Sequence, residues 1–198
     1  MPSDDSQPRR PSDIRELTDA RALRALTHPV RVALIEELVH GGAMTATELG
    51  ERIGETPTTC SFHLRQLAKY GLVEETGEGK GREKPWRATT AFTAWDPIPE
   101  SPELAAATTL LDTVVAERYF AQLMRWLEHK QHDSAQWQEA ALFGDRVLYL
   151  TAEELAALGD KVRELVDVYF ERLVKPELRP AGARPVTYLH LAFPADQP

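Results

Sequence analysis

Hydroxyl, basic and aromatic side chains recur on one short stretch of the chain, residues 56–73 (TPTTCSFHLRQLAKYGLV). Thr58, Phe62, Arg65 and Lys69 are spaced so that a helix would place them on one face. Hydroxyls and guanidinium groups bind phosphates and base edges, and an aromatic ring can pack against a thymine methyl. This pattern predicts contact with DNA. The candidate residues on the stretch are Thr56, Thr58, Thr59, Ser61, Phe62, His63, Arg65 and Lys69.

The opposite face of the same stretch is apolar. Cys60, Leu64 and Leu67 lie at helical spacing and are expected in the core. Thr56 is a good N-cap before Pro57, so we expect a recognition helix over residues 57–70, ended by Gly71.

Three of the candidate residues have a second interpretation. His63 lies between the two faces, which favours a structural or phosphate-contact role over base reading. For Arg65 and Phe62 the alternative is an ordinary solvated surface.

Two helices are expected before the recognition helix. The first follows Pro29 and stops at the Gly41–Gly42 pair. Its expected core residues are Val32, Ile35, Leu38 and Val39. Thr45 and Glu48 form a capping-box pattern at the start of the second, ATELGERI. A short helix, a turn containing glycine and a further helix form a helix-turn-helix.

A β-hairpin is expected after the recognition helix. LVEET (72–76) and PWRATTAF (85–92) have strand composition, and the Gly-rich, charged segment 77–84 between them indicates the hairpin tip. Three helices followed by such a hairpin make a winged helix, whose basic tip would reach the minor groove or the DNA backbone. A solvated tip is the alternative. The candidate wing residues are Lys80, Arg82, Lys84 and Arg87.

Residues 21–90 resemble the ArsR-type family of bacterial winged helix-turn-helix regulators. The resemblance rests on His-Pro-x-Arg at 28–31, Ser-x-His-Leu at 61–64, Gly-Leu-Val at 71–73 and the Gly-rich wing. It implies a transcriptional regulator that binds double-stranded DNA as a homodimer, with repression as the expected effect. Many members of this family sense metals through cysteine pairs, and this chain has one cysteine.

Charge and composition agree with a DNA-binding protein of the cytoplasm. The net charge of −8 is divided as −2 over residues 1–20, +1 over 21–90 and −7 over 91–198, so the acidity lies away from the expected DNA face. A single cysteine fits a reducing compartment, and no apolar run approaches a membrane span. We therefore expect a cytoplasmic protein, associated with the nucleoid when it is bound to DNA.

Catalytic and metal chemistry find little support in the residues. No phosphate-binding glycine loop, nucleophile elbow or catalytic triad is evident, so we expect no enzyme activity and no cofactor. His129, His132 and Asp133 lie close together, but a solvated helix end is favoured over a metal site. Cys60 as a redox switch is a further alternative.

The C-terminal half carries a different pattern. The prolines of residues 92–102 indicate a linker, and a long helix from Glu103 to about His129 would pair with its symmetry mate or pack within its own chain. A capping box at Thr151 starts a further helix, between strands expected at RVLYL (146–150) and VTYLHLAF (186–193). Aromatic residues there are candidates for lining an organic-ligand pocket, with plain core as the alternative: Trp126, Trp137, Tyr149, Tyr169 and Phe170.

The sequence thus predicts a mainly α fold with small β content (α+β), a winged helix-turn-helix followed by a helical domain containing a strand-helix-strand unit. The expected domains are a disordered tail (1–12), a DNA-binding domain (13–91), a linker (92–102) and a dimerisation and effector domain (103–198). Two alternatives to a plain DNA-binding repressor stay open: a regulator gated by a small organic ligand, and a winged helix that binds protein.

Overall fold

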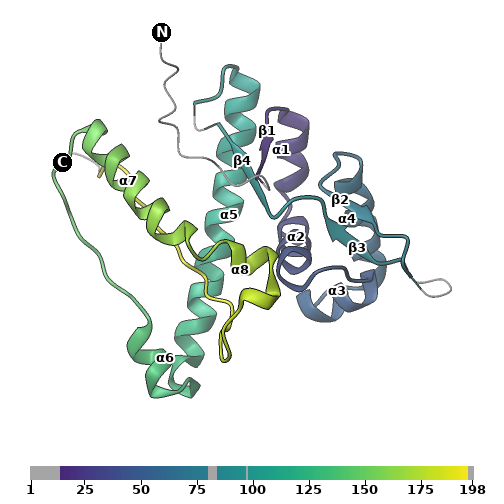
Figure 1. The fold of residues 1–198 in the computed structure, drawn as a ribbon. Coiled ribbons are helices and arrows are strands. Elements are labelled where there is room, and N and C mark those ends of the chain that lie inside the picture. Colours follow the sequence, from purple (N-terminus) through teal and green to yellow (C-terminus); the bar gives the residue numbers. More distant parts are fainter. Residues whose placement is uncertain (1–13, 80–83, 97, 196–198) are drawn as a thin grey trace, which may run out of the picture. The chain divides into compact units, whose positions relative to one another are not determined.

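The computed structural model describes residues 14–79, 84–96 and 98–195. The chain divides into two compact units, Met1–Arg118 and Tyr119–Pro198. Figure 1 shows mostly helices with a few short strands, which confirms the expected α+β class. The tail expected at residues 1–12 lies outside the described residues.

Four helices form the first part of the Met1–Arg118 unit: α1 (Ala20–Leu26), α2 (Pro29–Gly41), α3 (Ala46–Ile53) and α4 (Pro57–Ala68). Each begins after a side chain that accepts a first-turn N–H. Thr45 and Glu48 form the predicted capping box, with the Thr45 N–H donating to Glu48 Oε2 at 2.7 Å. The predicted helix-turn-helix is confirmed, with α4 ending two residues before the expected Tyr70.

Two glycines shape the turn between α3 and α4. Gly54 adopts the left-handed conformation with φ of 75°, which ends α3. Gly50, inside α3, lies against the turn that follows, because a Cβ atom there would be 2.6 Å from the Glu55 carbonyl oxygen. This close approach allows the turn, and therefore the start of α4, to lie near α3.

The expected hairpin forms from two strands shorter than predicted. β2 (Val73–Glu75) pairs with β3 (Trp86–Ala88) in an antiparallel register that places Val73 opposite Ala88. Met44 before α3 also bridges to Trp86, through backbone hydrogen bonds of 2.9 and 2.8 Å. The hairpin is therefore tied to the start of α3 as well as to the end of α4.

A second strand pair corrects the linker expected at 92–102. β1 (Ile14–Leu17) runs parallel to β4 (Phe92–Trp95), so the first four residues of the expected linker are a strand. These residues have β-prone composition, and the strand that pairs with them, β1, lies more than seventy residues earlier in the chain. Trp95 Nε1 then donates to Asp112 Oδ1 at 2.9 Å, which holds β4 to the next helix.

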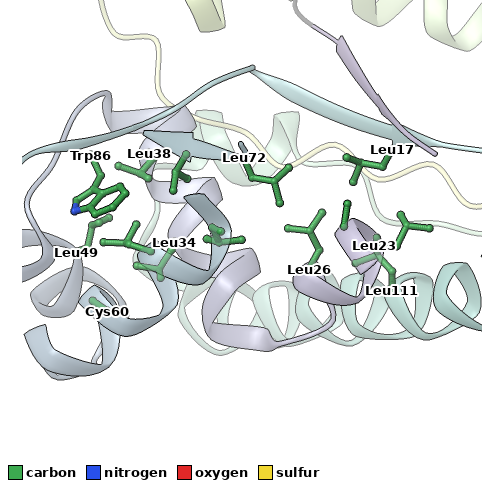
Figure 2. Close-up of a cluster of buried hydrophobic side chains, with 14 of the residues drawn as sticks. Leu17, Leu23, Leu26, Leu34, Leu38, Leu49, Cys60, Leu72, Trp86 and Leu111 are labelled. Atoms are coloured by element: carbon green, nitrogen blue, oxygen red, sulfur yellow. The ribbon is translucent and has the colours of Figure 1, made fainter. Parts of the chain in front are cut away.

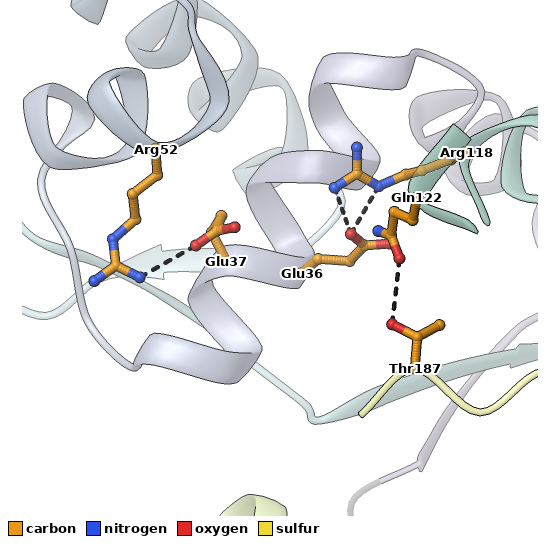
Figure 3. A network of polar contacts seen from close by, with 6 residues as sticks. All are labelled: Glu36, Glu37, Arg52, Arg118, Gln122 and Thr187. Atoms are coloured by element: carbon orange, nitrogen blue, oxygen red, sulfur yellow. Dashed lines mark hydrogen bonds and ion pairs between the residues drawn. The ribbon is translucent and has the colours of Figure 1, made fainter. Parts of the chain in front are cut away.

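That next helix is α5 (Pro102–His129), the long helix expected from the sequence. The start of α5 at Pro102 is not the boundary between the two units, because the first part of α5 belongs to the unit that ends at Arg118. Ala107, Leu111 and Val114 on this part are buried. Arg118 Nε donates to Glu36 Oε2 on α2 at 2.7 Å (Figure 3), in a pair whose side chains are about a fifth exposed, at 22% and 19%.

One apolar cluster joins these elements. Figure 2 shows it, with Trp86 of the hairpin toward one end and Leu111 of α5 toward the other. Burial of these side chains is the main favourable contribution to folding of the unit. The largest fully buried members are Leu23, Leu34, Leu49, Leu64, Leu67, Leu111, Val73 and Cys60.

The Tyr119–Pro198 unit contains the end of α5, a 3-10 turn η1 (Lys130–His132), α6 (Ala135–Ala140), α7 (Ala152–Asp167), α8 (Glu171–Val174) and a second 3-10 turn η2 (Pro176–Leu178). The predicted capping box of Thr151 and Glu154 starts α7. Arg184 holds the C-terminal segment to η1 through two hydrogen bonds to the Asp133 carboxylate, 2.7 and 3.0 Å long.

The strand-helix-strand unit expected around α7 is not formed. Residues 141–150 and 183–195 are extended but contain no strand (Figure 1). A strand needs a neighbour for its N–H and C=O groups, and in the described part of the chain the two segments make no backbone hydrogen bond with each other. Strand composition alone was an insufficient guide here.

None of the helices within the described ranges has both the length and the apolar composition needed to cross a bilayer.

Candidate nucleic-acid interface

Helix α4 presents two chemically distinct faces. Cys60, Leu64 and Leu67 are completely buried, as the spacing predicted. On the other side Phe62 is 50% exposed, and Thr58, Arg65 and Lys69 are exposed as well. This exposed ring and the polar residues around it form the candidate contact surface of α4.

The hydroxyl groups at the start of α4 divide into two kinds. Thr56 Oγ1 accepts from the Thr59 N–H at 3.1 Å and lies 2.9 Å from Thr59 Oγ1, so these two side chains cap the helix. Among the described residues, the hydroxyls of Thr58 and Ser61 have no hydrogen-bond partner, so both are available to an outside acceptor or donor. The first two turns of α4 therefore offer two uncommitted hydroxyls.

The two basic residues of α4 lie along its outer side. Arg65 Nε donates to the Ser61 carbonyl oxygen at 3.1 Å, which aligns the guanidinium along the helix. This hydrogen bond does not use the terminal N–H groups of the guanidinium. Lys69 Nζ donates to Gln66 Oε1 at 3.1 Å. Both side chains are held by neighbours on their own helix, which lowers the entropy lost on binding a phosphate or a base.

His63 occupies a different position from the other candidates. It is only 7% exposed, and its Nδ1 accepts from Arg31 Nε at 3.2 Å. The His28 ring lies 4.4 Å away. Burial, together with the electrostatic effect of the neighbouring His28 and Arg31, lowers the pKa of His63. The His63 ring therefore lies between α2 and α4, behind the exposed face of α4.

Arg15 is a residue that the sequence interpretation missed. From β1 it donates to the carbonyl oxygens of Gly71 and of Tyr70, the latter at 2.9 Å. These carbonyls follow the end of α4 and would lack partners within the helix. No local pattern marks Arg15, because its acceptors are more than fifty residues away.

Two of the four basic wing candidates are paired with carboxylates in the described structure. Lys84 Nζ lies 3.2 Å from Glu75 Oε2, and Arg87 lies 2.6 Å from Glu74 Oε1, so both cations are paired across the hairpin. These pairs are exposed and can exchange a carboxylate for a phosphate. The other two candidates, Lys80 and Arg82, fall at positions outside the described residues.

The aromatic residues considered for a ligand pocket are exposed or half-buried in the described structure. Tyr149 is 99% exposed and Tyr169 is 58% exposed. Trp126 and Trp137 are half-buried, and Trp137 lies under the Arg184 guanidinium at 4.1 Å. Phe170 is also half-buried. A ligand pocket at these residues therefore stays a prediction.

The residues considered for a metal site or a redox switch make local contacts or are buried. His129 and His132 each direct Nδ1 to a carbonyl oxygen of the preceding turn, and the Asp133 carboxylate binds Arg184. Burial raises the pKa of the Cys60 thiol, which disfavours the reactive thiolate. A hollow of about 160 Å³ bordered by Pro29, Ile53 and Glu55 is smaller than typical ligand pockets, which begin at about 300 Å³.

A family model described as a helix-turn-helix domain matches residues 26–76. The match runs from the end of α1 through α2, α3 and α4 to the strand β2. No curated protein matches the chain. The geometry and the match together support the class of winged helix-turn-helix, DNA-binding transcription regulators.

Proposed function

We propose that this chain is a transcriptional repressor of the ArsR type that binds operator DNA as a homodimer. Helix α4 would enter the major groove, and the tip 77–84 would lie on the minor groove or the backbone. The observation that carries this proposal is the division of α4, with Cys60, Leu64 and Leu67 at 0% exposure behind a polar face that includes Phe62 and Arg65.

The contacts expected on DNA follow from the groups left available. The terminal N–H groups of Arg65 match the paired acceptors of guanine or a phosphate. Thr58 and Ser61 can bind backbone phosphates near the start of α4, where the helix dipole also favours an anion. Phe62 provides an apolar surface for a thymine methyl.

A dimer is proposed because one α4 reads only a few base pairs. Two copies related by a two-fold axis would place two α4 helices in successive major grooves, about 34 Å apart. Repression follows from the resemblance to ArsR-type regulators. We expect the protein to act in the bacterial cytoplasm and to bind its operator without a cofactor and without catalysis.

Selection of duplexes from a random pool tests the proposal. The full-length protein is expected to enrich an inverted repeat whose half-sites are about one helical turn apart, and affinity for it should fall steeply with salt. Arg65→Ala should lower the enrichment of this sequence by at least about 10-fold, whereas Arg21→Ala, which changes an exposed arginine on α1, should not. Enrichment of no sequence by the wild type, or equal enrichment of the same sequence by Arg65→Ala, would overturn the assignment of α4.

A further inference from the structure

Two β-prone segments in the Tyr119–Pro198 unit leave their apolar side chains in solvent. They are residues 142–150 (the first segment) and 184–193 (the second segment). In the first, Val147 is 79% and Tyr149 is 99% exposed; in the second, Phe193 is 75% exposed. Where the structure describes side chains in the Tyr119–Pro198 unit, all of them are half-buried or exposed. Folding this unit alone would gain too little apolar burial to offset the loss of chain entropy.

In the described structure the backbone of both segments also lacks hydrogen bonds to other backbone groups. Among the described residues, neither segment takes part in a backbone–backbone hydrogen bond beyond those of the turns that precede it. Extended, apolar, nearly uncharged chain with free N–H and C=O groups pairs readily with another strand, and native proteins cover such edges. The missing component is therefore a strand partner.

In the described residues the two segments do not pair with each other, and the second is held by other contacts. Arg184 binds Asp133 with both of its terminal nitrogens, and Thr187 Oγ1 donates to Gln122 at 3.4 Å. These contacts tie the start of the second segment to η1 and to the end of α5. In the described structure the first segment has no hydrogen bond to the second.

We infer that the two segments form an intermolecular sheet between two copies of this chain, in which the first segment of one copy pairs with the second segment of the other. This inference rests on the proposed function, since it names the surface of the operator-binding dimer. The exchange is reciprocal, so one two-fold axis satisfies all four segments.

The area available fits a second copy. The two segments expose ten large apolar side chains. At on the order of 100 Å² each, they offer roughly 1,000 Å², against about 800 Å² that each partner buries in a standard stable interface. A unit that needs such cover to fold needs a partner present wherever the chain is made, and another copy of the chain meets that condition.

Light scattering of the full-length protein between about 1 and 100 µM tests the inference without DNA. The wild type is expected at twice the 22.2 kDa of one chain. Val147→Lys and Leu191→Lys should each raise the dimer dissociation constant at least about 30-fold, because each buries a charge in the sheet. Ile98→Lys is the matched control, since Ile98 is 82% exposed and outside both segments. A monomeric wild type, or equal effects at all three positions, would overturn the inference.

Amide hydrogen exchange identifies the sheet itself. Amides of both segments should be protected in the wild-type dimer and lose that protection in Val147→Lys, while amides of α2 and α4 keep theirs, which also shows that the variant is folded. Protection that persists in a monomeric variant would mean pairing within one chain. A dimer with unprotected segments would mean an interface elsewhere. Failure of DNA selection with both results as expected would count only against the proposed function.

Discussion

Arg31 Nε on α2 donates a hydrogen bond to His63 Nδ1 on α4 across 3.2 Å, while Arg31 Nη1 donates to the Ala25 carbonyl oxygen at 2.9 Å. One guanidinium thus links the end of α1, the start of α2 and the middle of α4. Two of the short motifs on which the family resemblance rested, His-Pro-x-Arg and Ser-x-His-Leu, meet at this bond. Their shared role is to fix the orientation of α4.

The first prediction concerns the pH dependence of stability. His63 has a pKa in the folded protein below its ordinary value of 6.5, so the unfolded chain binds the proton more readily. The contribution of neutral His63 to the free energy of unfolding is full above pH 6.5 and is lost as the pH falls through 6.5 toward the lower folded value. Urea unfolding from pH 8 to pH 5 should show this loss.

In His63→Gln the part of the slope that His63 contributes should be absent. His40→Gln removes an exposed histidine from α2 and serves as the control, which should keep the wild-type slope. An unchanged slope in His63→Gln would show that other groups cause the acid sensitivity.

The second prediction concerns Arg65. Arg65→Ala should weaken binding to the selected duplex about 10- to 100-fold, or about 1–3 kcal/mol, because a bidentate contact is lost. The midpoint of thermal unfolding should not move, since the side chain is exposed and its only hydrogen bond is to its own helix. Fluorescence anisotropy at fixed salt measures the affinity, with Arg21→Ala alongside.

The third prediction concerns Gly50. Alanine there would place Cβ 2.6 Å from the Glu55 carbonyl oxygen, and the turn before α4 must move to relieve the contact. We expect a loss of about 1–3 kcal/mol in the free energy of unfolding and weaker DNA binding. In Gly159→Ala the new Cβ meets only the flexible end of Arg163, at 3.5 Å, so this helical substitution should be neutral or stabilising by up to about 1 kcal/mol.

The fourth prediction compares two ion pairs of α5. A double-mutant cycle with Arg118→Met and Glu36→Gln should give a coupling of about 1–2 kcal/mol, because both side chains are mostly buried. The same cycle for Arg24→Met and Glu103→Gln should give about 0.5 kcal/mol or less, because those side chains are 48% and 64% exposed. Equal couplings would show that burial does not control the strength of these pairs.

Local sequence signals located the elements that begin with a cap or end with a glycine. Thr45 with Glu48, Thr56 before Pro57, and Thr151 with Glu154 start helices where the pattern predicted. These signals work because their hydrogen bonds join residues no more than three positions apart, so the sequence contains both partners.

The core of α2 was predicted less well. Leu38 is buried as expected, but Leu34, at 0% exposure, and Ala33 were missed, whereas Val32, Ile35 and Val39 are only half-buried. A helix with elements packed on more than one side has no single apolar stripe, so periodicity cannot single out its most buried positions.

By itself, the sequence determined the winged helix-turn-helix and the two faces of α4, because caps, glycines and helical periodicity act over a few residues. Only the tertiary structure decided that Arg15 caps the end of α4, that Arg31 holds His63, that β1 pairs with β4, and that the two segments around α7 lack a partner within the described chain. Each of these features depends on contacts between groups that are distant in the chain, and composition does not specify such contacts.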